Sequence, residues 1–210
     1  MRVPGRIGLA AGAVGVGAAV LFAVVRLVPS DPAEPPAPGP SATGRIVPAT
    51  VAPLPPSTPV RLDVPRIGVR TALMKLAKNP DRTVETPPLA RAGEAGWYRL
   101  GPAPGSRGAA VIIGHVDSQR GPAVFYRLGE LRPGDRFSVR RADGRTAVFR
   151  VDSVERVPKD RFPTERVYAD PGYPAIRLIT CGGRFDRGTG HYVDNVIAYG
   201  HLLGASAAKR

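Results

Sequence analysis

The sequence predicts a mainly β fold, either a closed or nearly closed barrel or a sandwich, for the chain after residue 60. Roughly six to eight short apolar segments are separated by turn residues such as Pro133-Gly134 and Asp143-Gly144, a spacing typical of these folds. No window has a long apolar period of 3.6 residues, which a helical fold would require. Only residues 124–131 suggest a short helix.

Each strand is predicted from an apolar run that ends at turn residues. Pro65 and Gly68 separate the first two runs, and Asp143-Gly144 is a strong signal for a two-residue hairpin turn. The run at residues 110–113 is continuously apolar, which indicates a buried strand. The predicted strands cover residues 60–64, 69–74, 110–113, 137–140, 147–154, 175–181 and 195–199.

The first 28 residues predict an N-terminal membrane anchor or signal segment. Their apolar core, residues 7–25, would span about 28 Å as a helix, close to the hydrocarbon thickness of a bilayer. Arg2 and Arg6 precede this core and Arg26 follows it. A cleaved signal peptide is the alternative. An anchor is favoured because no small-x-small cleavage site follows Val25 directly.

Residues 29–59 differ in composition, because proline punctuates alanine, serine and threonine throughout. Such a segment has few groups to bury and predicts an extended, polyproline-like spacer. A disordered connector without a length requirement is equally compatible with this composition.

The predicted β domain is strongly basic. Residues 61–210 carry 26 Lys plus Arg against 15 Asp plus Glu, a net charge of +11. Basicity raises nucleic-acid binding as a hypothesis. However, no aromatic-basic interleaving, zinc-ligand spacing or helix-turn-helix pattern accompanies it, so we expect no nucleic-acid partner. A basic exported domain would be attracted to wall polymers and lipid head groups. No metal site is expected, since the acidic residues are scattered and the chain has one cysteine.

That cysteine, Cys181, follows an apolar run and precedes Gly182 and Gly183. Such a position is a strand end where the backbone bends and a ligand could approach closely. A free cysteine is usually a small core hydrophobe. The alternative is a nucleophile, which requires an acid or base elsewhere in the chain.

His115 is the candidate partner, because it also ends an apolar run, 66 positions before Cys181. Two strand ends that each carry one reactive group can meet in a β fold. Of the other histidines, His191 is expected in a loop and His201 on the surface. A histidine on an apolar strand is more often structural than catalytic, so spacing alone leaves this assignment open.

These motifs resemble a known family. Leu178-Ile179-Thr180-Cys181, with an upstream Gly114-His115, is similar to the signature of the sortases, the cysteine transpeptidases of Gram-positive cell surfaces. Longer strings further resemble the actinobacterial branch called class F. The resemblance covers roughly residues 60–204, and its longer strings lie at residues 113–118, 121–125, 181–186 and 191–197.

The resemblance implies an eight-stranded sortase-type barrel with short helices at residues 60–204, followed by a tail at 205–210. It also implies a single-pass membrane protein, with the anchor at 1–28, the linker at 29–59 and an extracytoplasmic catalytic domain. In the family's reaction, Cys181 would attack the Thr-Gly amide of a Leu-Pro-x-Thr-Gly-like sorting signal. His115 would be the general acid and base. An amino group of a peptidoglycan precursor or of another surface protein would resolve the thioacyl intermediate, so no cofactor is expected.

The family also implies an arginine that supports the oxyanion. It usually lies at or just before the strand after the cysteine strand, yet residues 194–197 hold no arginine. Arg187 is therefore the expected residue, with Arg184 as second choice, although most arginines of so basic a domain are simply solvated. Thr180 and Asp117 are candidates for substrate binding. Alternatively, Thr180 favours the strand, and Asp117 orients the imidazole or bonds the following turn.

The alternative function is a non-enzymatic, membrane-tethered basic domain that binds anionic cell-wall polymer, with Cys181 as a core residue. It explains the anchor, the spacer and the charge. It leaves the joint occurrence of His115, Cys181 and their flanking motifs as a coincidence.

Overall fold

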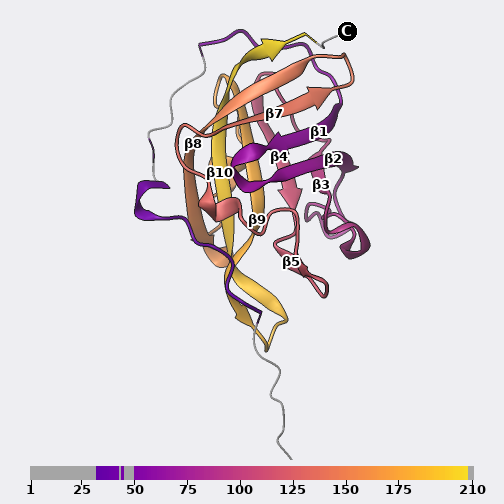
Figure 1. Cartoon of the computed structure of the whole chain (residues 1–210). Helices are drawn as coiled ribbons and strands as arrows, with labels where there is room; N and C mark the ends of the chain where they lie inside the picture. Colours follow the sequence, from indigo (N-terminus) through magenta and orange to yellow (C-terminus); the bar gives the residue numbers. More distant parts are fainter. Residues whose placement is uncertain (1–31, 43, 45–49, 208–210) are drawn as a thin grey trace, which may run out of the picture. The chain divides into compact units, whose positions relative to one another are not determined.

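Eight strands close on themselves into a barrel in the order β1-β2-β3-β4-β9-β10-β8-β7 (Figure 1). The structure is a computed structural model that describes residues 32–42, 44 and 50–207. The barrel strands are β1 (Pro59–Val64), β2 (Val69–Leu76), β3 (Ala95–Tyr98), β4 (Gly108–Gly114), β7 (Arg136–Arg141), β8 (Thr146–Pro158), β9 (Pro174–Asp186) and β10 (His191–Ser206).

The remaining elements are short. β5 (Asp117–Ser118) and β6 (Gly121–Pro122) form a small two-stranded ribbon outside the barrel. The one α-helix of the described residues is α1 (Thr164–Tyr168), and the predicted helix at 124–131 is reduced to the 3-10 turn η4. The 3-10 helices are η1 (Pro40–Ala42), η2 (Pro65–Ile67), η3 (Leu89–Arg91), η4 (Leu128–Glu130) and η5 (Lys159–Arg161).

Side-chain alternation separates the barrel interior from its outer surface. Ile112 of β4 and Leu178 of β9 belong to the interior core, which receives apolar side chains from all eight strands. Their neighbours Val111 and Ile179 belong instead to a second apolar cluster on the outer face. This period of two is the alternation expected of strands. Closure of the sheet confirms the predicted mainly β fold and selects the eight-stranded barrel over the sandwich.

Two strands run beyond their predicted ends. β9 continues through Gly182 and Gly183 to Asp186, because a register irregularity opposite residues 192–194 of β10 accommodates the extra backbone. β10 continues to Ser206, so the first residues of the expected tail still pair with β8. β3 was not predicted, because its four residues are too few for a period to be recognised.

The proline-rich segment is not the extended spacer that its composition predicts, where the structure describes it. Ala42 is 1% exposed and packs into the barrel core. Glu34 forms an ion pair with Arg156 of β8, with Oε1 2.7 Å from Nη1. Further along, the backbone amide of Leu54 donates to the carbonyl of Gly105 at 2.8 Å. Small residues and prolines therefore line the barrel rather than leave it.

The expected anchor at residues 1–28 lies outside the described residues. Within the part of the chain that is described, no helix has both the length and the apolar character needed to cross a bilayer.

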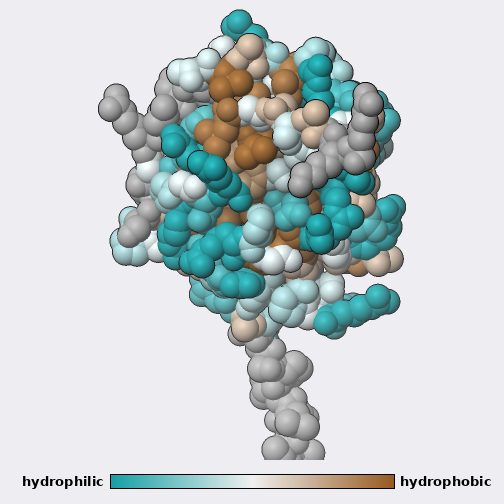
Figure 2. Space-filling model, turned by 45° about the horizontal axis from the view of Figure 1, so that its top comes forward, coloured by the Kyte–Doolittle hydropathy of each residue, from teal (hydrophilic) through white to brown (hydrophobic). Residues whose placement is uncertain are grey.

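Large apolar side chains are exposed at Leu89 and Leu100. Figure 2 shows one face of the molecule, where apolar residues gather in its upper part and hydrophilic residues border them.

His201 is buried, which corrects its prediction as a surface residue. It is 4% exposed, and its Nδ1 lies 2.7 Å from Oδ1 of Asp152, which is also buried. Burial raises the pKa of the Asp152 carboxyl, whereas the nearby His201 lowers it. Asp152 lies at a register irregularity of β8, where pairing skips from Ser153 to Val151. The bulge thus brings a carboxyl to a histidine 49 positions away.

Removal of His201 tests this buried pair. We expect His201→Ala to lower the free energy of unfolding by about 3 kcal/mol, because the Asp152 carboxyl stays buried without its partner. Denaturant unfolding of the full chain, followed by the fluorescence of Trp97, measures the loss. His191→Ala is the matched control at an exposed histidine, with an expected change below about 0.5 kcal/mol. Equal losses in both variants would contradict the pairing.

Candidate active site

The parallel pairing of β4 with β9 brings the two candidate catalytic residues level with each other. The register runs from Gly108↔Pro174 to Ile113↔Ile179, an offset of 66 positions. His115 and Cys181 are separated by the same offset. Because neighbouring strands lie about 4.8 Å apart, continuing the register by two residues puts His115 beside Cys181.

Both residues also belong to the outer face of the barrel. Val111, Ile113 and Ile179 contribute to the outer apolar cluster, and residues two apart on a strand point to the same side. His115 continues the first series and Cys181 the second. Both are partly exposed, and Cys181 is a free thiol. The continued register thus places the thiol and the imidazole on the same, outer side of the barrel wall.

Asn195 completes a row across three strands, because it is the register partner of Cys181 on β10. Directly opposed residues of an antiparallel pair have Cβ atoms about 5 Å apart on the same face. Asn195 is half-buried, and its amide carries two N–H donors. His115, Cys181 and Asn195 therefore place an acid or base, a thiol and a neutral donor side by side.

The two glycines after Cys181 lie close against side chains of β10. A Cβ on Gly182 would lie 2.7 Å from Cγ2 of Val196, and one on Gly183 would lie 2.3 Å from Oδ2 of Asp194. Gly183 also has a φ of 73°, in the left-handed region that favours glycine. It lies at the register irregularity after Cys181, so the strand bends directly beyond the thiol.

The imidazole of His115 is held through one nitrogen. Its Nε2 lies 2.5 Å from the carbonyl oxygen of Pro87, and a carbonyl can only accept a hydrogen bond. Nε2 therefore carries a proton and donates it to Pro87. In the neutral ring Nδ1 is then the unprotonated nitrogen, so Nδ1 is the atom that can exchange a proton with a reacting group.

The loop after His115 is tied to β10 by Asp117. The hydroxyl of Tyr192 donates to Oδ2 of Asp117 at 2.6 Å. Burial raises the pKa of Tyr192, and the hydrogen bond to Asp117 and the nearby Cys181 raise it further, so the hydroxyl stays protonated and keeps donating. Asp117 was expected to bind substrate, orient the imidazole or bond the following turn. Its carboxylate accepts a hydrogen bond from a tyrosine 75 positions away.

Thr180 points away from the outer face. It is 3% exposed, and its Oγ1 is buried without a hydrogen-bond partner among the described residues. Cys181 and Thr180 are consecutive on a strand, so their side chains lie on opposite faces. The Thr180 hydroxyl therefore lies on the face of β9 opposite Cys181.

The two candidate arginines lie at different distances along the chain. Arg184 is an exposed residue of β9, at the irregularity that follows Gly183. Arg187 follows the last residue of β9, in the turn before β10. Along the chain, Arg184 is three residues and Arg187 six residues from Cys181.

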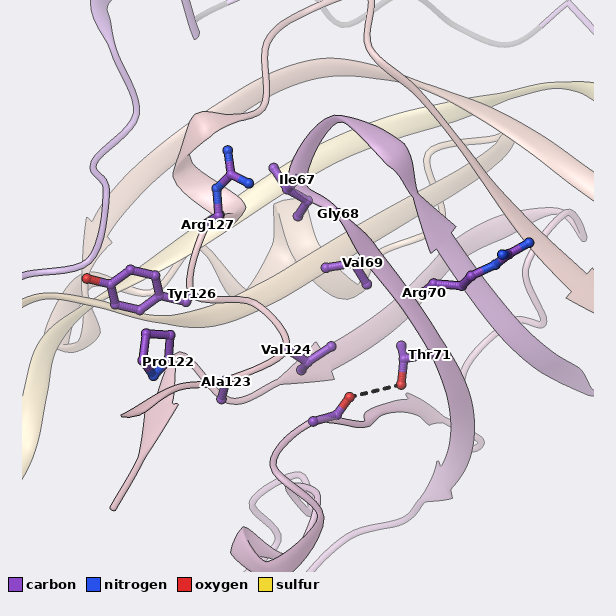
Figure 3. Close-up of a pocket in the computed structure, with 11 residues that line it drawn as sticks. Ile67, Gly68, Val69, Arg70, Thr71, Pro122, Ala123, Val124, Tyr126 and Arg127 are labelled. Atoms are coloured by element: carbon purple, nitrogen blue, oxygen red, sulfur yellow. Dashed lines mark hydrogen bonds between the residues drawn. The ribbon is translucent and has the colours of Figure 1, made fainter. Parts of the chain in front are cut away.

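A cleft of about 510 Å³ opens beside the loop that follows His115 (Figure 3). Residues 67–71 of η2 and β2 face the segment 122–127 across it. The backbone of this segment bonds the histidine loop, because the amide of Phe125 donates to the carbonyl of His115 at 3.0 Å. Neither His115 nor Cys181 lines this cleft.

A second cleft, of about 480 Å³, reaches Ala109 of β4 on the outer face. Tyr98 and Tyr168 line it, with ring centroids 6.1 Å apart in an edge-to-face arrangement. Both tyrosines pack in the outer cluster that also contains Ile113 and Ile179. Most of this cluster is buried, and its β4 member Ile113 is partly exposed.

Taken together, the site can perform nucleophilic acyl chemistry. Cys181 offers a nucleophile and His115 an acid or base, while Asn195 offers a donor for negative charge. The sequence interpretation had missed Asn195 and Tyr192. The signal for Asn195 is its place at the start of an apolar strand directly after the cysteine strand. Tyr192 has no comparable signal, because its partner is in a distant loop.

Comparisons with known proteins agree with this interpretation of the site. Residues 62–203 match the family model described as Sortase domain. Comparison with curated proteins gave no significant match.

Several solved structures share the fold. Sortase C1 of Streptococcus agalactiae, in complex with MTSET, is 20% identical, with 69% of this chain and 67% of that chain covered and a TM-score of 0.53. A lid mutant of sortase A from Corynebacterium diphtheriae is 18% identical, covering 72% and 73%, with a TM-score of 0.55. Sortase A of Listeria monocytogenes is 15% identical, covering 74% and 93%, with a TM-score of 0.54.

Substitution of Tyr192 tests the tie between β10 and the histidine loop. We expect Tyr192→Phe to lower the free energy of unfolding by roughly 2 kcal/mol, because a hydrogen bond to a carboxylate is lost. Amide hydrogen exchange at residues 115–124 should accelerate as the loop is released. Tyr126→Phe is the control, because no hydrogen bond of that hydroxyl involves the described residues. Unchanged exchange in Tyr192→Phe would contradict the proposed tie.

Proposed function

The chain belongs to the sortase family of cysteine transpeptidases, and from this premise we propose that it cleaves the Thr-Gly bond of Leu-Pro-x-Thr-Gly-like sorting signals. The acyl group then passes to an amine of a peptidoglycan precursor or of another surface protein. The observation that carries the proposal is the parallel register of β4 and β9, which places His115 level with Cys181 on the outer face when it is continued by two residues.

In the proposed reaction, the proton of the Cys181 thiol passes to Nδ1 of His115, and the thiolate attacks the threonine carbonyl and forms a carbon–sulfur bond. The tetrahedral intermediate collapses with rupture of the carbon–nitrogen bond, and His115 donates a proton from Nδ1 to the leaving glycine amine. An incoming amine then attacks the thioester and loses a proton to His115, so the thiol is regenerated. Each step exchanges one acyl bond for another, so no external energy source is required.

The cleft at Tyr98 and Tyr168 supports the binding of an extended peptide. A five-residue extended segment spans about 16 Å. Along β4, this cleft begins near Ala109, six residues before His115. Between them, Ile113 is partly exposed, whereas Ile179 is buried. A sorting signal with its threonine at Cys181 would extend along β4 toward the cleft.

The oxyanion of the intermediate needs donors near Cys181. We propose that the side-chain amide of Asn195 supplies one, because Asn195 is opposite Cys181 in register and β10 lacks an arginine at that level. Arg184 is the charged donor that we favour from its place on β9. Arg187, the residue first expected from the resemblance, is the alternative.

Motifs at residues 113–118, 181–186 and 191–197 support an assignment to the actinobacterial class F branch. We further propose that the first 28 residues anchor the protein in the cell membrane, with the barrel extracytoplasmic, because their apolar core has the length of a bilayer span. The sorting signal, the acceptor amine and the anchor would then lie in one compartment.

Mass spectrometry of peptide products tests the proposed reaction. We expect the full-length chain, in detergent, to cut a Leu-Pro-x-Thr-Gly peptide after threonine and join the acyl part to an added amine. Cys181→Ala should abolish the product, and His115→Ala should lower kcat about 10²- to 10⁴-fold. His191→Ala is the control and should retain activity. Joined product from Cys181→Ala, or cleavage at another bond, would contradict the proposed chemistry or the proposed signal, respectively.

Substitutions of the proposed donors separate their roles. We expect Asn195→Ala to lower kcat about 100-fold with a smaller change of KM, because the donor acts mainly on the oxyanion. Arg184→Ala should lower kcat more than Arg187→Ala, which lies further along the chain. Steady-state kinetics of the joined product gives both constants. Wild-type kcat in Asn195→Ala, from protein with a wild-type unfolding midpoint, would exclude Asn195 as a donor.

A further inference from the structure

The outer surface of β2, β1, β7 and β8 carries a dense set of arginines. Interior residues such as Leu62, Val139 and Phe149 fix which side chains of these strands point outward, because residues alternate between the two faces. Figure 3 shows Arg70 of β2 directed away from the segment 122–127. We call this surface the arginine face, and its charged residues are Arg61, Asp63, Arg70, Arg136, Arg140 and Arg150.

The arginine face has like charges opposite each other, an arrangement that does not stabilise the fold. Arg61 is the register partner of Arg140, and Arg136 is the register partner of Arg150. Like charges directly opposite each other destabilise a sheet. Natural surfaces that cost stability are often functional. These two cross-strand pairs therefore indicate a ligand of opposite charge.

Few carboxylates neutralise the arginine face. Asp63 forms an ion pair with Arg70, with Oδ2 of Asp63 3.4 Å from Nε of Arg70. The other four arginines have no ion pair with any residue that the structure describes. Five arginines and one aspartate give the face an excess of four positive charges.

The arginine face is also hollowed. A cleft of about 440 Å³ lies between its side chains and is lined by three arginines and three smaller polar residues, Arg61, Asp63, Arg70, Ser138, Arg140 and Thr146. The arginine fork matches the oxygens of a phosphate group and binds two of them at once. Hydroxyls of serine and threonine add further donors. The lining thus fits phosphate oxygens.

The arginine face lies on the far side of the barrel from the candidate active site. In the closed order of eight strands, β1 is four positions from β9 in either direction. The outer side of β1 therefore points away from the outer side of β9, which carries Cys181. A ligand on the arginine face would leave the thiol and the peptide surface free.

We propose that the arginine face binds the phosphate groups of a linear anionic polymer and so holds the enzyme with its active site directed away from that polymer. Arg140 and Arg136 are four residues apart on β7, which corresponds to about 13 Å of strand. The two arginine pairs thus form separate contact points along one direction, as a repeating chain of phosphates requires. The face offers no large exposed apolar side chain for insertion between lipids, which favours a polymer over a bilayer.

Binding of a labelled inorganic polyphosphate chain to the full-length protein tests the proposal. Fluorescence anisotropy over a series of salt concentrations gives the affinity and its salt slope. We expect the double variant Arg61→Gln, Arg140→Gln to bind about 10-fold more weakly and to lower the slope of log K against log salt by about 1.4. Its unfolding midpoint should equal or exceed that of the wild type, because a like-charge pair is removed.

The matched control removes the same charge elsewhere. Arg99→Gln with Arg161→Gln changes two exposed residues outside the arginine face, after β3 and in η5. We expect this control to bind within about 2-fold of the wild type. The variant Arg136→Gln, Arg150→Gln provides an independent test of the second pair and should weaken binding as the first does. If the control and both face variants lost the same affinity for polyphosphate, net charge alone would explain the binding, and the proposal would be overturned.

Two further measurements separate the alternatives. Vesicles of phosphatidylglycerol and phosphatidylcholine replace polyphosphate, and a greater loss of vesicle binding than of polyphosphate binding in the face variants would assign the face to a bilayer. Transpeptidation of a soluble peptide by the face variants should remain at the wild-type rate, because the arginine face does not contact the active site. A failure of the polymer proposal is thereby distinguishable from a failure of the proposed reaction.

Discussion

β4 and β9 run parallel in a barrel whose other pairs, apart from β2 with β3, are antiparallel. This pairing fixes the register of two strand ends that no local interaction brings together. A shift of one residue would turn every side chain of one strand to the opposite face. The thiol would then enter the barrel interior while the imidazole stayed outside, so the candidate chemistry depends on a register that the packing of Ile112 and Leu178 selects.

Around this register the structure holds the site from three sides. Pro87 fixes the tautomer of His115, and Tyr192 binds the loop that carries it through Asp117. On β9, the glycines beyond Cys181 let the hairpin bend without crowding β10. These contacts come from segments far apart in the sequence. Positions of reactive groups are thus set by the surrounding shell rather than by the strands alone.

Sequence reasoning succeeded where local chemistry decides the structure. The Asp143-Gly144 turn lies between β7 and β8 as predicted, and the apolar run before His115 is a strand. It failed where a distant partner decides. His201 is buried because a bulge brings Asp152 to it, and the proline-rich segment packs because the barrel offers it Arg156 and a place for Ala42. Asn195 became a candidate only when the register placed it opposite Cys181.

The packing of the proline-rich segment also changes how far the barrel can stand from a point of attachment. A segment that packs against the barrel would add nothing to the length of a spacer between the barrel and the anchor proposed above. From Pro32 onward, the described residues therefore belong to the same compact unit as the barrel. The ion pair of Glu34 with Arg156 lies near the start of this unit. The distance that the barrel can reach from such an attachment would then depend on fewer residues than the composition suggests. The same distance would decide which acceptors are available to the enzyme.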